Sequence, residues 1–182
     1  MNKIILETNN LKKSFNHADG KITLFENFNI KIKEGELVAL VGPSGSGKSS
    51  LLHLLALLDD PTKGEIILNK QETQHLSNYQ KDELRRSSVS IIFQDNNLLT
   101  DFTAIENVMM PLIIKGENTK EIFKKAKQIL KNVKIFNRSK HFPNQLSGGE
   151  QQRIAIARAI IAETKIILAD EPTGNLDFKT SK

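Results

Sequence analysis

A glycine-rich segment at residues 42–49 has the residue types that bind the phosphates of a nucleotide. It reads GPSGSGKS and matches the pattern G-x-x-x-x-G-K-[ST], directly after an apolar run and at the start of a helical pattern. Gly42, Gly45 and Gly47 have no Cβ, so the backbone can approach phosphates closely, and N–H groups at a helix start attract an anion. The segment predicts a nucleoside triphosphate site, which kinases, motors and GTPases share.

Each polar residue of this loop has an expected role. Lys48 would supply a positive charge to the β- and γ-phosphates, Ser49 a hydroxyl to Mg²⁺, and Ser50 a contact to the α-phosphate. A glycine-rich loop that matches by chance is the alternative, and the flanking strand and helix patterns argue against it. The residues expected to wrap around the phosphates are Gly42, Pro43, Ser44, Gly45, Ser46 and Gly47.

Two carboxylates, Asp170 and Glu171, end the apolar run 166–169. A strand beside the phosphate loop would present Asp170 toward Mg²⁺ through a water molecule and place Glu171 near the γ-phosphate. There Glu171 could orient or deprotonate the attacking water. A strand that simply ends in solvent is the alternative, but the preceding phosphate loop and the PTGNLD that follows favour the catalytic interpretation.

The elements that must position these residues alternate between strands and helices. Residues 28–33, FNIKIK, alternate apolar and polar side chains as a half-buried strand does, and Glu34-Gly35 follows as a turn. Residues 36–41 form an apolar run that predicts a fully buried parallel strand. The other expected elements are strands at 66–68, 89–93 and 165–169, and helices at 47–57, within 103–133 and at 148–162.

This order of elements implies a parallel α/β core. The largely helical middle, residues 96–155, is expected to be a subdomain inserted between the core segments 1–95 and 156–182.

Composition excludes several classes of protein. The 182 residues include no cysteine, which rules out disulfide frameworks and thiolate metal sites, and no apolar run approaches the roughly 18 residues of a membrane span. The net charge is +5, but the densest lysine stretch falls on the solvent-exposed face of a predicted helix. No run of basic residues alternates with aromatic residues. We therefore expect no nucleic-acid partner.

Residues 146–153 read LSGGEQQR and resemble the signature motif of ABC-type ATPases. Ser147, Gly148 and Gly149 stand at the start of a predicted helix, where N–H groups and the helix dipole favour an anion. The alternative is an ordinary serine-capped helix with Glu150 in its first turn. That alternative leaves the two glycines unexplained, because glycine weakens a helix.

The resemblance implies how the two phosphate-binding segments work together. In this family two cassettes pair head to tail, and each signature helix closes over the ATP held by the loop of its partner. The second ATPase subunit is therefore an expected partner, and a lone monomer should hydrolyse ATP poorly. Gln151 is expected to join Ser147, Gly148 and Gly149 at this site.

Other positions resemble further motifs of the family. Phe15 resembles the aromatic residue that stacks on adenine, with a core phenylalanine as the alternative. Gln94 resembles the glutamine that touches Mg²⁺ and senses the γ-phosphate, so Ser49, Gln94 and Asp170 are the expected metal-binding residues. Residues 175–177 resemble the loop that crosses to the other subunit.

The resemblance implies an ATPase that converts ATP and water to ADP and phosphate and uses ATP and Mg²⁺ to power a membrane permease. Its fold would be an α/β P-loop nucleoside triphosphatase core of the ABC ATPase type, with a parallel sheet, antiparallel N-terminal strands and an inserted helical subdomain. We expect it at the cytoplasmic face of the inner membrane as a peripheral subunit. ABC proteins of DNA repair or translation are a rival class, but they usually bring two cassettes, zinc-binding cysteines or a long coiled coil.

Longer strings narrow the resemblance within the family. Residues 42–66, 106–112 and 168–177 look most like the group that releases lipoproteins from the inner membrane or drives macrolide and peptide efflux. Amino-acid importers and the division-linked cassette stay open as alternatives. The surface expected to dock the permease, with simple packing as the alternative for each residue, comprises Asp95, Asn96, Leu98, Leu99, Phe102 and Met109.

The family continues after the crossing loop with a strand and a switch histidine, whereas residues 178–182 complete this sequence. We expect a C-terminally truncated cassette that lacks the final core strand, binds ATP and turns it over slowly. The alternative is a nucleotide-binding remnant with no catalytic role.

Overall fold

The structure is a computed structural model that describes residues 3–18 and 20–172. The chain divides into two compact units, Met1–Val89 and Ser90–Lys182. An antiparallel sheet organises the first unit, and a layer of helices organises the second.

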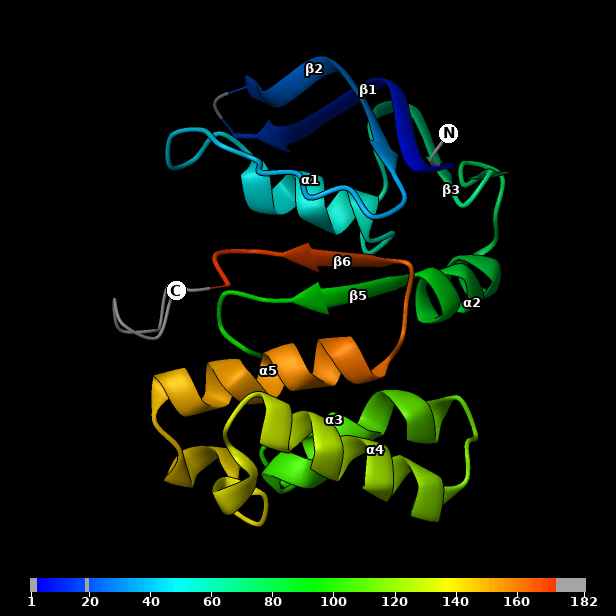
Figure 1. Cartoon of the computed structure of the whole chain (residues 1–182). Coiled ribbons are helices and arrows are strands. Elements are labelled where there is room, and N and C mark those ends of the chain that lie inside the picture. The colour runs from blue at the N-terminus through cyan, green and yellow to red at the C-terminus, as the bar shows by residue number, and fades with distance from the viewer. Residues whose placement is uncertain (1–2, 19, 173–182) are drawn as a thin grey trace. The chain divides into compact units, whose positions relative to one another are not determined.

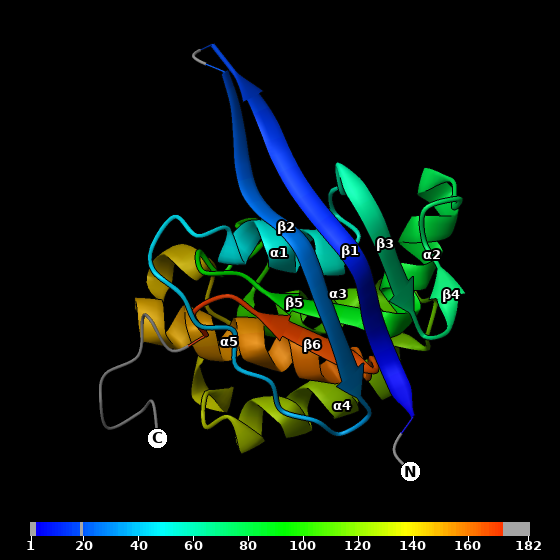
Figure 2. The same cartoon turned by 90° about the horizontal axis from the view of Figure 1, so that it is seen from above.

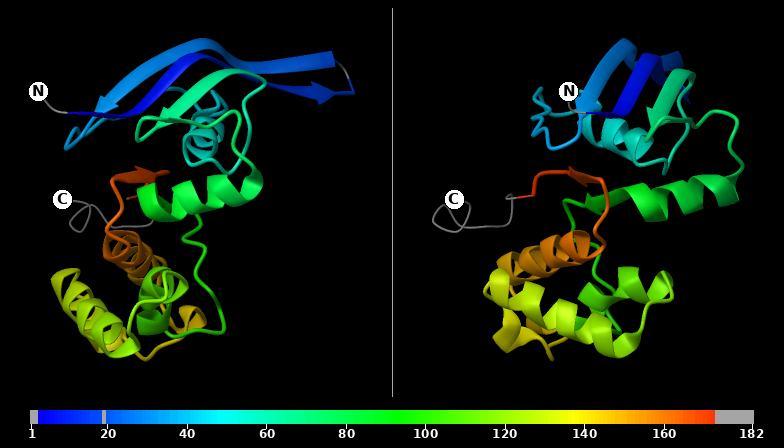
Figure 3. Two further views of the ribbon diagram at one scale, coloured as in Figure 1. Left: turned by 90° about the vertical axis from the view of Figure 1, so that its right-hand side faces the viewer. Right: turned by 45° about the vertical axis from the view of Figure 1, so that its right-hand side comes forward.

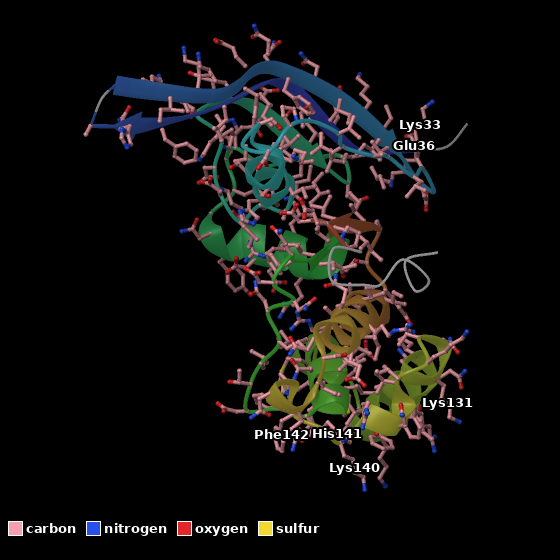
Figure 4. All side chains as sticks on the ribbon, turned by 90° about the vertical axis from the view of Figure 1, so that its left-hand side faces the viewer. Lys33, Glu36, Lys131, Lys140, His141 and Phe142 are labelled. Atoms are coloured by element: carbon pink, nitrogen blue, oxygen red, sulfur yellow. The ribbon has the colours of Figure 1, made fainter. Side chains whose placement is uncertain are left out.

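The first unit is built on an antiparallel sheet in the order β2-β1-β3-β4 (Figure 2). Strands β1 (Ile4–His17) and β2 (Gly20–Lys33) form a long ribbon, and β3 (Lys63–Leu68) pairs with β1 on its other side. The short β4 (Gln71–Glu72) pairs with β3 and completes the sheet. At the end of β2 the chain turns, and the Lys33 N–H donates to the Glu36 carboxylate at 2.8 Å. Figure 4 labels both residues at this turn.

Helix α1 (Lys48–Leu55) lies under one face of this sheet (Figure 1). It buries Leu51, Leu54 and Leu55, and on the sheet Leu6 and Leu68 are completely buried. Apolar side chains at three- and four-residue spacing on a helix form one continuous stripe, which is why this short helix packs rather than frays. Helix α2 (Asn78–Ser88) follows β4 and begins at Ser77, whose hydroxyl accepts a hydrogen bond from the Gln80 N–H.

The expected helix at 47–57 and strands at 28–33 and 66–68 are present. The antiparallel N-terminal strands implied by the resemblance are present too, but the residue pattern gave no bounds for β1, and α2 was not predicted. The sequence of β1 lacks a regular alternation of apolar and polar residues, because its register with β2 shifts between Thr8 and Leu11. Asn10 within this irregularity has a φ of 49°. A bulge of this kind inserts a residue and breaks the two-residue alternation.

The prediction of a buried strand at 36–41 is wrong. The structure has no strand at these six residues, and the side chains of Leu37 and Val41 are 99% and 85% exposed. A parallel strand exists only where neighbouring strands accept and donate its backbone hydrogen bonds. Among the described residues of the first unit, the strands that could do so all belong to the antiparallel sheet.

The second unit combines a two-stranded sheet with a layer of helices. Strands β5 (Val89–Ile92) and β6 (Ile166–Ala169) lie side by side and run in the same direction (Figure 1). The strands expected at 89–93 and 165–169 are therefore confirmed. The helices are α3 (Ala104–Ile114), α4 (Thr119–Asn132) and α5 (Gly148–Ile161), with single turns η1 (Phe136–Arg138) and η2 (Pro143–Gln145) between α4 and α5.

The three helices of this unit pack around one apolar core (Figure 3). Val108, Ile122, Leu130 and Ile154, from all three helices, are completely buried in it. The helical spacing within 103–133 is thus resolved into two helices separated by a turn at Gly116, whose φ of 79° suits glycine. The subdivision into 1–95, 96–155 and 156–182 stays a prediction. None of the helices within 3–18 and 20–172 is long and apolar enough to cross a membrane.

Candidate functional site

The glycine-rich loop turns sharply before α1. Gly45 and Gly47 have φ values of 78° and 87°, which side chains rarely adopt. A Cβ on Gly42 would lie 2.9 Å from the Ser46 Oγ, so the loop also closes tightly on itself. The Ser46 N–H donates to the Pro43 carbonyl at 3.3 Å, which holds this turn. At Gly45 and Gly47 the backbone conformation itself favours glycine, and at Gly42 the Ser46 side chain leaves little room for a Cβ.

The start of α1 is open to an anion. Its N-cap is Gly47, and among the described residues no side chain caps its first turn, which contains no acidic residue. The N–H groups of Lys48, Ser49 and Ser50 precede the first helical hydrogen bond, from Leu51 to Gly47 at 2.8 Å. N–H groups of this kind and the positive helix end favour a phosphate.

The ammonium group of Lys48 folds back over the loop. Its Nζ donates to the carbonyls of Gly42 at 3.0 Å and Pro43 at 2.9 Å. Both contacts are exposed, so a phosphate can compete for the ammonium at little cost. Glycine backbone, open helix start and lysine together fit a triphosphate.

Phe15 lies on β1, and its ring is 44% exposed. The Lys13 Nζ is 4.9 Å from the ring centroid and is fixed by Asp59 at 2.6 Å and the Asp60 carbonyl at 2.8 Å. Burial raises the pKa of Asp59, but hydrogen bonds from Lys13 and the Asp60 N–H outweigh it and leave that pKa lowered. Phe15 is thus a supported, accessible ring of the kind on which a base can stack.

The second unit brings the three acid and amide residues of the prediction to one end of its sheet. Gln94 follows β5, and Asp170 and Glu171 follow β6. The Asp170 N–H donates to the carbonyl of Ile92, the last residue of β5, at 2.9 Å. This bond extends the pairing of β5 and β6 by one residue. The Gln94 Nε2 donates to the Glu171 Oε2 at 3.2 Å. Glu171 has a φ of 46°, a conformation that for a bulky residue is often found at functional sites.

The signature segment begins α5, but this helix start is already capped. The Ser147 Oγ accepts the Glu150 N–H at 3.3 Å, and a Glu150 carboxylate oxygen accepts the Ser147 N–H at 2.8 Å. The Arg138 Nε donates to the other Glu150 oxygen at 2.9 Å. The hydrogen bond from the Ser147 backbone, opposed by burial and assisted by Arg138, lowers the pKa of Glu150.

Gly148 and Gly149 occupy the first two helical positions after this cap. Their N–H groups precede the first helical hydrogen bond, from Gln151 to the Ser147 carbonyl. The Gln151 side chain has a different arrangement: its Nε2 donates to the Pro143 and Leu146 carbonyls at 2.9 and 3.3 Å. Gln151 thus holds the segment before the helix, and its expected role toward the nucleotide stays a prediction.

Two residues of the expected docking surface face the interior instead. Asn96 and Met109 are only 4% and 6% exposed, because Met109 belongs to the helical core and Asn96 follows a tight turn. Leu99 and Phe102 remain exposed, as does Asp95, and Leu98 packs partly on the core.

Sequence reasoning missed the residues that hold the loop between β5 and α3. Asn107 is completely buried, and its side chain bonds the Leu99 N–H and the carbonyls of Leu99, Phe102 and Thr103 at 2.8 to 3.1 Å. A polar residue on the apolar face of a helical pattern was the available signal.

A second missed residue, Arg158, donates from its guanidinium to the carbonyls of Asn96 and Asn97 at 2.7 and 2.8 Å. Both asparagines have positive φ values, 58° and 45°. Burial lowers the pKa of Arg158. The turn that follows Gln94 is therefore fixed by a side chain of α5, the helix that starts at the signature segment. The expected crossing loop, 175–177, lies outside the described residues.

Comparison with known proteins agrees with this arrangement. A family model described as ABC transporter matches residues 25–174. The chain is 48% identical over its whole length to the lipoprotein-releasing system ATP-binding protein LolD of Rickettsia bellii (strain RML369-C), of which it spans 80%.

Two solved structures have the same fold. A dimeric post-hydrolysis structure of the ATP-binding cassette MJ0796 bound to ADP and Pi matches with a TM-score of 0.92 at 41% identity, covering 97% of this chain and 78% of that one. A second dimeric structure of MJ0796, a bacterial ABC transporter cassette, matches with the same TM-score and coverage at 42% identity. The expected fold class, the ATPase activity and the use of ATP with Mg²⁺ are thereby confirmed at the level of the family. The chain belongs to the ABC transporter family.

Proposed function

We propose that this chain is the ATP-hydrolysing subunit that powers a membrane permease in the release of lipoproteins from the inner membrane. The observation that carries the ATPase part is the presence in one chain of an open, glycine-shaped helix start and of a Gln94–Glu171 pair at the end of a parallel sheet. The relation to LolD over the whole chain supports the lipoprotein part.

In this proposal the first unit binds the nucleotide. The loop at 42–47 wraps around the phosphates, Lys48 leaves its two loop carbonyls to contact the β- and γ-phosphates, and Phe15 stacks on the base. Lys48 would exchange two neutral carbonyl acceptors for an anionic phosphate, and a hydrogen bond in which donor and acceptor are both charged is the stronger kind, which favours the bound state.

The second unit supplies the groups that act on water. Glu171 accepts a proton from the attacking water or orients it, and Gln94 holds the Glu171 carboxylate until the nucleotide is bound. From the family resemblance, Ser49 of the first unit and Gln94 and Asp170 of the second are proposed as Mg²⁺ ligands, because each side chain has an oxygen of the kind that Mg²⁺ prefers. The cation would neutralise charge on the transferred phosphoryl group.

A second copy of the chain is proposed to complete each site. Ser147, Gly148 and Gly149 of one copy would contact the phosphates bound by the loop of the other, in a two-fold arrangement. The dimeric MJ0796 structures support this pairing. The permease is proposed to contact the exposed residues Asp95, Leu99 and Phe102, which would place the subunit peripherally on the cytoplasmic face of the inner membrane.

The ATPase proposal is tested by removing the carboxylate of Glu171. We expect Glu171→Gln to lower kcat about 10²- to 10⁴-fold, the usual contribution of general base catalysis, while ATP still binds. Glu163→Gln is the matched control, because Glu163 is an exposed carboxylate that precedes β6 and whose contact is a 3.9 Å surface ion pair with Lys125. Equal rates for the wild-type and Glu171→Gln proteins would contradict the proposal.

The cargo is tested with permease subunits reconstituted in vesicles that contain a triacylated lipoprotein. We expect ATP and this chain to release the lipoprotein to a soluble acceptor, and the Glu171→Gln protein to release none. Efflux of a macrolide without lipoprotein release would instead favour the alternative group.

A further inference from the structure

The carboxylate of Glu150 joins a backbone turn to a guanidinium. One oxygen accepts the Ser147 N–H at 2.8 Å, and the other accepts the Arg138 Nε at 2.9 Å. The Glu150 side chain is only 25% exposed, so its bond with Arg138 is partly shielded from water, whereas its bond with the Ser147 N–H is exposed. Rotation of this carboxylate would therefore release the backbone turn at Ser147 and the guanidinium of Arg138 together.

The Arg138 side chain has a further polar neighbour besides Glu150, and its turn is anchored on α4. It ends η1, and its Nη1 lies 3.5 Å from the His141 Nε2. The adjacent Phe136 ring carries the ammonium groups of Lys127 and Lys131 of α4 at 5.5 and 5.8 Å from its centroid. The guanidinium is thus presented by a turn that is anchored on α4.

The segment that follows Arg138 caps the start of α3. The His141 carbonyl accepts the Ala104 N–H at 2.8 Å, and the Ser139 carbonyl accepts the Ile105 N–H at 2.9 Å. These are N–H groups of the first helical turn, which need partners outside the helix. Figure 4 shows His141 and Phe142 on this segment, between η1 and η2.

The start of α3 in turn fixes the loop at 99–103. Thr103 bonds to Glu106 through both its N–H, at 2.8 Å, and its hydroxyl, at 2.6 Å. Asn107 bonds the backbone of Leu99 and Phe102. A continuous series of hydrogen bonds therefore joins the exposed Leu99–Phe102 loop to the signature serine.

We propose that Arg138 is a positioning residue that sets the Ser147 turn through Glu150 and couples this turn to the loop at 99–103. The proposal rests on the proposed function, in which that turn receives a phosphate and that loop meets the permease. Rigid elements joined by hydrogen bonds can carry such coupling, and energetic coupling must be measured to establish it.

The first test needs no nucleotide. Hydrogen exchange of the amides at 146–150 is compared between the wild-type protein, Arg138→Ala and Lys115→Ala. Lys115 is the matched control, because its Nζ also joins the helix layer, from the end of α3 to the Ala162 carbonyl at 2.5 Å, without touching the signature turn. We expect about tenfold faster exchange at 146–150 in Arg138→Ala, the effect of losing one charged hydrogen bond, and wild-type exchange there in Lys115→Ala.

The second test separates positioning from folding. We expect Arg138→Ala to lower kcat about 10- to 100-fold while single chains keep their affinity for a fluorescent ATP analogue, because the loop at 42–49 is unchanged. Arg138→Lys should recover part of kcat, since its ammonium can contact Glu150 but cannot also reach His141. The double variant Arg138→Ala/Glu150→Gln should lose no more than the larger single loss.

Specific outcomes overturn the inference. Equal exchange at 146–150 in Arg138→Ala and the wild type would do so, as would equal losses of kcat in Arg138→Ala and Lys115→Ala, or fully additive losses in the double variant. Failure of the wild-type chain to bind ATP would instead contradict the proposed function, and the exchange experiment would still decide the role of Arg138.

Discussion

The N-termini of α1 and α5 differ in whether a side chain caps their first backbone N–H groups. The start of α1 has a glycine N-cap in the left-handed conformation, and within the described part of the chain it has neither a side-chain cap nor an acidic residue. The start of α5 has a serine cap closed by Glu150, which Arg138 supports. One start is open to an anion before any ligand arrives, whereas the other is stabilised from within.

This difference indicates that the two helix starts contact the nucleotide at different stages. A helix start with no side-chain cap leaves its first N–H groups to water or to a ligand, so the start of α1 suits the nucleotide that binds first. The capped start of α5 keeps its shape without a ligand and leaves the N–H groups of Gly148 and Gly149 for a second contact. It therefore suits a surface that must be ready when a partner copy presents its nucleotide.

The largest effect that would sharpen the comparison is on nucleotide affinity. Lys48→Ala should weaken binding of an ATP analogue to single chains about 100-fold, because a charged hydrogen bond to phosphate is lost, whereas Ser147→Ala should leave that affinity unchanged. Fluorescence titration measures both. A similar loss in the two variants would break the distinction between the helix starts.

The same substitution should change stability in opposite directions at the two helix starts. Gly47→Ala should destabilise the chain by about 1–3 kcal/mol, because the residue has a φ of 87° and its Cβ would lie 3.1 Å from the Leu24 Cβ. Gly148→Ala, at a helical position, should stabilise it by about 0.5–1 kcal/mol. Urea unfolding monitored by circular dichroism gives both values, and equal signs would count against the distinction.

A smaller effect is expected at the cap of α5. Ser147→Ala removes the hydroxyl that accepts the Glu150 N–H and should cost about 1 kcal/mol of unfolding free energy. An alanine at Ser77, the equivalent cap of α2, should cost a similar amount while leaving ATP-driven dimerisation intact. Sedimentation with ATP distinguishes the two variants, and weaker dimerisation in both would show a general loss of stability.

The smallest expected effect is on pH dependence. The pKa of Glu150 is lowered in the folded chain, so its contribution to stability is present above the pKa of the unfolded chain and is lost as pH falls through the folded value. Glu150→Gln should therefore flatten the fall of Tm in acid slightly. An unchanged acid limb in thermal melts would show that the carboxylate contributes nothing there.

Local features of this site could be predicted from the sequence, and features that depend on distant neighbours could not. The loop at 42–49 and the start of α5 are set by residues within a few positions of each other, so glycines and serine caps identify them. The run 36–41 failed as a strand because strand formation depends on partners elsewhere in the chain. Residue type alone does not distinguish a strand from an exposed apolar segment.

Side-chain contacts across the fold were beyond the sequence for a related reason. Gln94 and Glu171 were each expected at the site, but the hydrogen bond between residues so far apart depends on the pairing of β5 with β6. Arg138 and Arg158 look like ordinary polar residues of a helical region, and Asn107 differs from them only in falling on an apolar helix face. Their roles depend on the turns that bring backbone carbonyls and Glu150 within reach.

The central claim is that a triphosphate bound at the loop of one copy meets the start of α5 in another. Because the chain has no cysteine, Ser44→Cys in one chain and Asn144→Cys in another, both in the Glu171→Gln background, allow a specific cross-link with a short bismaleimide. The control mixes the Ser44→Cys chain with a Gln128→Cys chain, whose cysteine lies on the exposed side of α4. We predict a covalent Ser44→Cys/Asn144→Cys heterodimer with ATP and Mg²⁺ but not with ADP or without nucleotide. A yield that does not change with nucleotide, or no cross-link although both variants bind ATP, would contradict the claim.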